Sequence, residues 1–271
     1  MKNKFESFSK DTSLRPLIIV TNDDGADALG FANLIEAVRP FGDVLAIAPD
    51  TGQSGMSHAL TFKKPVRLYK LKDEPGLTVY KLTGTPVDCV KMALGKLIDR
   101  KPVLLVSGIN HGSNSSISSI YSGTVAAARE GALNAIPSAA FSSLDFSEKA
   151  DFSDFIPYIR SVCENILADG MPANSFVNVN FPHSDTANIR GLKVCRQASG
   201  VWEEEFVERI DPGGTPYYWL TGYLNNFELD ATDTDEYFLS ENWVSLVPIM
   251  VEVTAMDAFV HMKSWESASG K

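Results

Sequence analysis

The chain has 271 residues, of which 44% are hydrophobic and 21% are charged, enough to bury the core of one large domain or two small ones. Its formal net charge of −10 argues against a protein that binds a nucleic-acid duplex or a membrane through a basic face. No apolar run approaches the roughly 18 residues that span a bilayer. Three scattered cysteines and a polar N-terminus that does not look like a signal peptide lead us to expect a cytoplasmic protein.

The first half of the chain alternates between strand-like and helix-like segments. Apolar runs predict strands at residues 17–20, 43–48, 103–109 and 137–142. Helical patterns lie between them, at residues 29–40, 86–98 and 124–134. Two more runs, 66–71 and 77–82, are joined by KDEPG and predict a β-hairpin. This alternation indicates an α/β fold with a parallel sheet covered on both faces.

The second half of the chain has a different pattern. One helix is predicted at residues 152–167, followed by strands at 175–181, 191–197, 215–220 and 242–250. The acidic stretches EEEFVER and ELDATDTDEY lie among these strands, and we interpret them as solvated faces or loops rather than as sites.

Two adjacent carboxylates, Asp23 and Asp24, follow the first predicted strand within the stretch TNDDG. Like charges this close repel each other, and partial burial increases the penalty. One interpretation is a turn rich in Asx residues, in which Gly25 supplies a positive φ angle. The other is that a cation lies at the end of the strand and offsets the two charges. The loops that follow the other strands bear on this choice.

Polar loops follow several of the predicted strands, among them APDTGQSGMSH and SGINHGSNSS. Ligands of open parallel sheets bind outside the carboxyl ends of the strands, so we expect these loops to form one polar pocket. Asp23, Asp24, Ser54 and Asn110 would bring carboxylate, hydroxyl and amide oxygens to it. Such ligands suit Mg²⁺, Mn²⁺ or Ca²⁺ better than a structural zinc.

The stretch YSGTVAAAREGAL places Ser122, Gly123 and Thr124 at the start of a predicted helix. Backbone N–H groups and the helix dipole favour a phosphate group at such a position. A structural interpretation also remains open, because Ser122 or Thr124 can cap the helix without any ligand.

Other polar residues receive structural interpretations. Residues 85–88, with a threonine, a proline and an aspartate, resemble a capping arrangement at a helix start. Arg129 and Glu130 are expected to pair on a helix face rather than to line the cleft. The four histidines show no metal-ligand spacing, and His111 faces either the pocket or the solvent.

Several motifs of other enzyme classes are missing from the sequence. There is no G-x-x-x-x-G-K-[ST] loop, no G-x-G-x-x-G after the first strand, and no G-x-S-x-G nucleophile elbow. The chain is far longer than a phospho-acceptor receiver domain, and its D-D pair differs from the D-x-D of carboxylate-nucleophile phosphatases.

With these motifs considered together, the chain resembles the SurE survival proteins, which are divalent-metal-dependent 5′/3′-nucleotidases acting on nucleoside monophosphates. The resemblance rests on TNDDG, APDTGQSGMSHALT, GTPVDCV, VSGINHGSN and YSGTVAAAREG, which occur in the family's order. These motifs cover roughly the first 140 residues. The segment TAMDAFVHM, with Asp257 and His261, also looks like the family's C-terminal region.

The resemblance implies a Rossmann-like three-layer α/β sandwich with a mostly parallel sheet. We therefore expect an extension at residues 1–14, a catalytic region at 15–150, and a C-terminal region at 151–271 with a β-hairpin and a swapped segment. In the family this last region serves oligomerisation and cleft closure, so a homodimer or homotetramer is expected. The aromatic stretch TPYYWLTGYL agrees with such an interface.

The resemblance also implies roles for individual residues. It assigns the ligands of one divalent ion per subunit, Mg²⁺ or Mn²⁺, to Asp23, Asp24, Ser54 and Asn110, with the two aspartates also catalytic. It assigns phosphate contacts to Asn114, Ser122, Gly123 and Thr124. The expected reaction is hydrolysis of a nucleoside monophosphate by a metal-activated water. The alternative is a non-catalytic protein that senses phosphate or a nucleotide with the same pocket.

Overall fold

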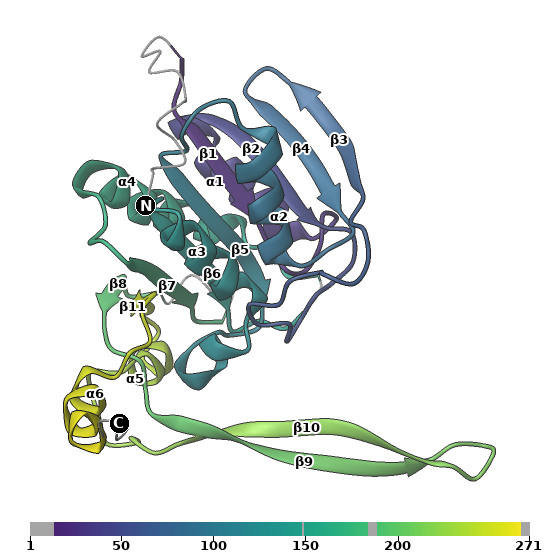
Figure 1. Cartoon of the computed structure of the whole chain (residues 1–271), viewed down its shortest axis with the longest axis vertical. Helices are drawn as coiled ribbons and strands as arrows, with labels where there is room; N and C mark the ends of the chain where they lie inside the picture. The colour runs from purple at the N-terminus through teal and green to yellow at the C-terminus, as the bar shows by residue number, and fades with distance from the viewer. Residues whose placement is uncertain (1–13, 148, 184–188, 267–271) are drawn as a thin grey trace, which may run out of the picture.

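The computed structural model describes residues 14–147, 149–183 and 189–266. The predicted extension at residues 1–14 lies outside this described part, except for Leu14. The chain forms a central sheet with helices on both faces, and a long two-stranded hairpin projects from one end of the body (Figure 1).

The sheet of the described residues has nine strands in the order β3-β4-β2-β1-β5-β6-β7-β11-β8. The strands from β4 to β7 in this order all run parallel: β4 (Leu77–Leu82), β2 (Asp43–Pro49), β1 (Leu17–Thr21), β5 (Leu104–His111), β6 (Ser138–Ser143) and β7 (Ser175–Phe181). Antiparallel neighbours flank them, because β3 (Leu68–Glu74) pairs with β4 and β11 (Val244–Met250) pairs with β7. The short strand β8 (Leu192–Val194) runs parallel to β11 at the far edge. The predicted mostly parallel α/β sheet is confirmed.

Alternate residues of β1 face opposite layers, which is why its continuous apolar run is needed. Ile18 and Val20 belong to a core that also holds residues of α1 (Leu29–Val38) and α4 (Ile156–Asp169). Leu17 and Ile19 belong to a second core, shared with α2 (Pro86–Met92) and α3 (Gly123–Leu133). A strand buried on both faces has no polar side, so the sequence carries no alternation. The three-layer sandwich is therefore as predicted.

The start of α2 has the predicted cap. Thr85 Oγ1 accepts a hydrogen bond from the backbone N–H of Asp88 at 3.1 Å, and Asp88 Oδ2 accepts one from the N–H of Thr85 at 2.9 Å. Pro86 occupies the first turn, where a missing N–H does no harm. The same cap holds a neighbouring loop, because Thr85 Oγ1 donates to the carbonyl of Ala59 and Asp88 Oδ1 accepts from the N–H of Thr61.

Short helical segments extend or connect the main elements. They are 3₁₀ turns at Arg39–Phe41, Ser116–Ile120, Ser153–Phe155 and Lys263–Trp265, a π turn at Ala93–Leu97, and the helices α5 (Asp235–Ser240) and α6 (Met256–Met262). The predicted hairpin insert is present as β3 and β4, although β3 continues to Glu74 and the turn is shorter than KDEPG. The side chains of α6 are exposed, Asp257 and His261 among them.

A hairpin of two long strands, β9 (Gly200–Ile210) and β10 (Pro216–Asn226), leaves the body near α5 (Figure 1). Its strands pair antiparallel along their whole length. The stretch EEEFVER, interpreted as a solvated face or loop, is the middle of β9, so the loop interpretation was wrong. Charged residues are tolerated in this strand because the hairpin lies outside the core and both of its faces reach solvent.

Candidate functional site

The carboxyl ends of the parallel strands meet at one edge of the sheet and border a pocket of about 590 Å³. Its lining includes many of the residues predicted for the site: Asp23, Ser54, Asn110, Asn114 and Ser122. Asp24, Gly123 and Thr124 lie next to these residues without lining the pocket themselves. The expected gathering of polar loops at this edge is therefore observed for the loops after β1, β2 and β5.

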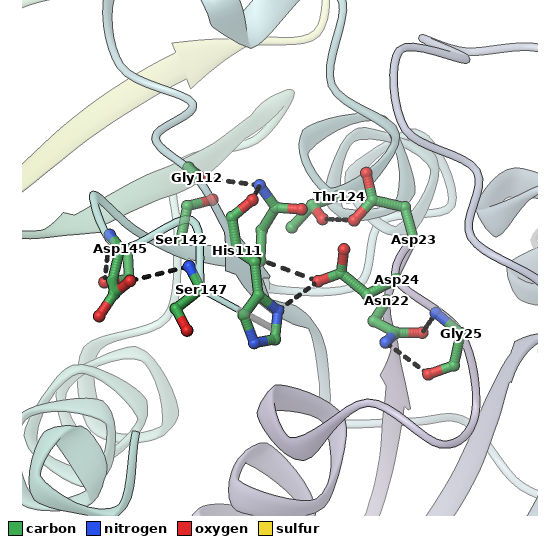
Figure 2. A network of polar contacts seen from close by, with 12 residues as sticks. Asn22, Asp23, Asp24, Gly25, His111, Gly112, Thr124, Ser142, Asp145 and Ser147 are labelled. Carbon is green, nitrogen blue, oxygen red and sulfur yellow. Dashed lines mark hydrogen bonds and ion pairs between the residues drawn. The ribbon is translucent and has the colours of Figure 1, made fainter. Parts of the chain in front are cut away.

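The turn after β1 is closed by Asn22 and not by the aspartates (Figure 2). Asn22 Nδ2 donates to the carbonyl of Gly25 at 2.8 Å, and Asn22 Oδ1 accepts from the N–H of Gly25 at 3.3 Å. Gly25 has the positive φ expected of it, at 109°. Because Asn22 satisfies the turn, Asp23 and Asp24 are left available for another role.

Asp23 is buried, with 3% of its surface exposed. Thr124 Oγ1 donates a short hydrogen bond to Asp23 Oδ1, and the backbone N–H of Thr124 also faces this carboxylate. Burial and the charge of Asp24 nevertheless raise the pKa of Asp23 to about 7, because the contacts from Thr124 offset them only in part. A buried acid with this pKa exchanges its proton readily near neutral pH, or gives it up to a cation.

Gly123 permits the close approach of α3 to this carboxylate. A Cβ atom at position 123 would lie 3.1 Å from Asp23 Oδ2 and 3.1 Å from Pro86 Cγ. Both separations are tighter than ordinary van der Waals contact. A larger residue would therefore push the helix start away from Asp23, which gives this glycine a local steric reason.

Asp24 is held by the end of β5. Asp24 Oδ2 accepts hydrogen bonds from the backbone N–H of His111 at 3.2 Å, and lies 3.1 Å from His111 Nδ1 (Figure 2). The His111 ring also packs on Phe152 at a centroid distance of 4.8 Å. Of the two orientations that the sequence left open for His111, the structure has the one that faces the pocket, and there His111 orients Asp24. The signal in the sequence is its position next to Asn110 at the same sheet edge.

Asn110 and Asn114 are both oriented by the surrounding backbone. Asn110 Nδ2 donates to the carbonyl of Gly112 at 2.7 Å, which leaves its amide oxygen as the atom suited to a cation. Asn114 Nδ2 donates to Ser142 Oγ at 2.7 Å, and the N–H of Asn114 donates to Asn180 Oδ1 at 2.8 Å. Ser54 is exposed and lines the pocket from the loop after β2.

Ser122 is the N-cap of α3. Ser122 Oγ accepts a hydrogen bond from the N–H of Val125 at 3.0 Å, so the capping interpretation holds for this residue. Its hydroxyl proton is still able to donate to an anion in the pocket that Ser122 lines. Thr124 differs, because its hydroxyl and its backbone N–H both face Asp23. The two hydroxyls of this helix start thus have different immediate partners.

Glu130 does not form the expected pair with Arg129. Glu130 is buried, and its carboxylate lies 3.0 Å from His58 Nε2 and 2.8 Å from Lys91 Nζ. Arg129 instead places its guanidinium over the Phe176 ring at 5.8 Å. Adjacent residues on a helix diverge by about 100°, so they seldom share a partner. The contact with His58 fastens the loop that carries Ser54 to α3.

The acidic stretch ELDATDTDEY also has a structural role that the sequence did not indicate. Asp235 is buried, and its carboxylate accepts from the backbone N–H groups of Ser116 and Ala198 at 2.7 and 2.8 Å. Glu236 Oε1 accepts from Ser115 Oγ at 2.5 Å. Burial raises the pKa of both carboxylic acids. These contacts brace the loop between Asn114 and α3. The stretch is an irregular, largely exposed loop up to residue 233, as expected, but the expectation of a solvated face or loop was wrong for Asp235, which is buried at the start of α5.

The hairpin contributes a wall of the pocket. The family resemblance implied cleft closure by the C-terminal region, but no motif pointed to the individual side chains. Trp202, Leu220, Thr221 and Gly222 line the pocket, together with Tyr121 and Phe146 from the body. We call the groups from the sheet-edge loops the polar end of the pocket, and the side chains of Trp202, Leu220, Tyr121 and Phe146 its apolar end.

The family model of Survival protein SurE matches residues 18–204. The chain belongs to the SurE family. A SurE relative from Phocaeicola vulgatus, named 5′-nucleotidase SurE, is 43% identical over 251 residues, which is 93% of this chain and 97% of the relative. One from Christiangramia forsetii with the same name is 46% identical over 253 residues, covering 93% and 97%. The crystal structure of the SurE protein from Aquifex aeolicus superimposes with a TM-score of 0.79 at 32% identity, covering 93% of this chain and all of that one.

Proposed function

We propose that this chain is a SurE nucleotidase that hydrolyses nucleoside monophosphates to a nucleoside and phosphate. It is an enzyme of the phosphomonoester hydrolase class, as supported by the names of its relatives and the length over which it matches them. Action on 5′-monophosphates follows those names, and action on 3′-monophosphates stays a prediction. The observation that carries the proposal is the buried carboxylate of Asp23, beside the half-buried Asp24, which meets the start of α3 at one pocket.

The residues of this pocket fit a divalent cation. Asp23 is a buried acid whose pKa is raised to about 7, so its ionised form lacks a sufficient positive partner in the protein. Among the described residues there is no group of three or more His, Cys, Asp or Glu side chains that could hold a metal ion, so a cation at this pocket would need hydroxyl or amide oxygens beside the two carboxylates. The donors at hand are the oxygens of Asp23, Asp24, Ser54 and Asn110, which suit Mg²⁺ or Mn²⁺. When bound, such an ion would neutralise phosphoryl charge and lower the pKa of a water molecule.

The chain's own groups then have distinct tasks. Thr124 fixes the position of Asp23, and His111 fixes that of Asp24, so both carboxylates are oriented before a ligand arrives. Ser122 and Asn114 lie on the pocket wall at the start of α3 and after β5, where an anion meets the favourable end of the helix dipole. Holding the phosphate there brings its phosphorus close to the carboxylates and limits its orientations.

One assay tests this proposal against the non-catalytic alternative. Phosphate release is measured from a panel of nucleoside 5′- and 3′-monophosphates, with Mg²⁺, with Mn²⁺, and with a chelator. We expect release with at least one cation and none with the chelator. Binding of a nucleoside monophosphate without release under every condition would support the sensor and overturn the enzyme. Asp23→Asn should abolish the release, and Asp27→Asn, which removes an exposed charge from the same loop, is its matched control.

We also propose a homo-oligomer formed through the C-terminal half. The hairpin, α6 and the 3₁₀ turn after α6 expose many large apolar side chains, among them Trp219, Leu220, Phe259 and Trp265. A protein that stayed monomeric would leave these side chains in water, which is unfavourable.

The expected cytoplasmic location is supported by three cysteines that are all free and buried. No helix within the described residues is long and apolar enough to cross a bilayer.

A further inference from the structure

The apolar end of the pocket is built from three aromatic rings that come from different parts of the chain. Tyr121 precedes α3, Phe146 follows β6, and Trp202 lies on β9 of the hairpin. Tyr121 is 48% exposed and Phe146 is 75% exposed, which is unusual for rings that border a pocket. None of the three rings belongs to the hydrophobic cores of the sheet fold, so all three are available to a ligand in the pocket.

Trp202 is fixed in orientation. Its indole Nε1 donates a hydrogen bond to Ser118 Oγ at 3.1 Å, which ties the base of the hairpin to the 3₁₀ turn beside the pocket. Across the hairpin, a Cβ atom at Gly222 would lie 3.4 Å from Trp202 Cε3 and 2.8 Å from the carbonyl oxygen of Glu203. The glycine therefore leaves space beside the indole that a larger residue would occupy.

Phe146 is also held in position, although its side chain is exposed. The turn that carries it is pinned on both sides, because Gly112 N–H donates to the carbonyl of Asp145 at 3.1 Å and Ser147 N–H donates to Asp145 Oδ1 at 2.8 Å (Figure 2). Gly112 has a φ of 105°, and a Cβ atom there would lie 2.5 Å from Phe146 Cε1. The ring thus rests on the glycine two residues after Asn110, at the border between the polar and apolar ends.

The size of the pocket matches a ligand with both a phosphate and a base. Its volume of about 590 Å³ falls within the range of sites for small organic molecules, about 300–1,000 Å³, and exceeds what a phosphate group needs. A ligand whose phosphate lies at Ser122 would extend its other end toward the rings. Aromatic rings stack on any nucleobase, because every base has a π face.

We propose that Trp202, Phe146 and Tyr121 form a stacking site for the purine or pyrimidine base of the substrate. The inference rests on the proposed nucleotidase function. It concerns the base of the substrate, which the residues at the phosphate-binding end of the pocket do not contact. Stacking recognises the face of a base and not its edge, so the site favours nucleotides over other phosphomonoesters while discriminating little among the bases.

The test compares two substrates that differ by the base alone. kcat/KM is measured for adenosine 5′-monophosphate and for ribose 5-phosphate, with Mn²⁺ or Mg²⁺ present. The variants are Trp202→Ala and Phe146→Ala, with Trp202→Phe as the conservative replacement. Phe62→Ala is the matched control, because Phe62 is an exposed aromatic side chain that lies outside the hairpin and does not line the pocket.

We expect each alanine variant to lose about 5- to 150-fold in kcat/KM for adenosine 5′-monophosphate, mostly through KM, with ribose 5-phosphate turnover unchanged. Trp202→Phe should recover most of the loss, and Phe62→Ala should match the wild type. Equal losses on both substrates, or no loss on either, would overturn the stacking site. Equal losses together with a changed mass by light scattering would instead make the rings a contact between subunits.

Failure of the proposed function gives a different result. In that case the wild-type protein releases phosphate from neither substrate. Binding of adenosine 5′-monophosphate is then measured by calorimetry on the same variants. Binding that weakens in Trp202→Ala and Phe146→Ala would keep the stacking site while removing the hydrolase, and binding that is equal in all variants would overturn the stacking site as well.

Discussion

Replacing Asp23 with asparagine should stabilise the metal-free protein and abolish its response to metal. Burial and the charge of Asp24 raise the pKa of Asp23 from 3.8 to about 7. A folded-state pKa above the unfolded value means that stability is fully present below pH 3.8 and is lost as the pH rises toward 7. Asparagine removes the charge and keeps an oxygen that can accept from Thr124.

The size of the effect follows from the pKa change. At 1.36 kcal/mol per pH unit, the move from 3.8 to about 7 corresponds to a penalty of about 4 kcal/mol once Asp23 is ionised. The Asp23→Asn variant should therefore be more stable than the wild type at pH 8 without metal, by at most about 4 kcal/mol. The advantage should shrink as the pH falls and vanish near pH 4. A cation at a hundredfold excess over its Kd should restore about 2.7 kcal/mol to the wild type alone.

Thermal and urea unfolding at pH 4, 6 and 8, each with a chelator and with Mn²⁺, measure these differences. Asp27→Asn removes a neighbouring exposed charge and controls for the change in net charge. The reasoning would be refuted by an Asp23→Asn variant that is no more stable than the wild type at pH 8 in chelator. Equal stabilisation of both proteins by Mn²⁺ would refute the ligand assignment instead.

Three further outcomes are expected. Gly123→Ala places a Cβ about 3.1 Å from the Asp23 carboxylate, so kcat/KM should fall roughly tenfold or more, as measured in a metal titration of activity. Ser122→Ala should lower the free energy of unfolding by about 0.5–2 kcal/mol through the lost helix cap, and kcat/KM by about ten- to a hundredfold through the lost phosphate contact. A lowered Tm with unchanged kinetics would mean that Ser122 only caps the helix. Burial acts to raise the pKa of Glu130, but its hydrogen bonds to His58 and Lys91 hold that pKa below the usual value. The Glu130→Gln variant should therefore be less stable than the wild type at pH 7 by about 1.5–3 kcal/mol, and the difference should disappear in acid as the carboxylate of the wild type gains its proton.

The parts of the fold that the sequence predicted are those governed by neighbouring residues. The strand at residues 17–20 was recognisable because a strand covered on both faces must be apolar throughout. The cap at Thr85 and Asp88 was recognisable because its two hydrogen bonds join residues three positions apart. The loops at the sheet edge were recognisable because parallel strands bring their carboxyl ends to one side.

The parts that the sequence did not predict depend on contacts between distant residues. Trp202 and Ser118 are 84 positions apart, and Asp235 and Ser116 are 119 positions apart. A carboxylate in an acidic stretch gives no local sign that backbone N–H groups will surround it. The strand β9 was missed for a related reason, since an exposed hairpin buries neither face and so produces no apolar alternation.

At the end of β1, different residues form the turn and the candidate ligand site. Asn22 closes the turn with its side-chain amide, which a carboxylate cannot do alone because it has no donor. The two aspartates are then each held by a different neighbour, Asp23 by Thr124 of α3 and Asp24 by His111 of β5. Within the described residues, no lysine or arginine forms an ion pair with either aspartate. The fold thus fixes the positions of both carboxylates without a lysine or arginine beside them, and an arriving cation finds oriented oxygens whose repulsion it relieves on binding.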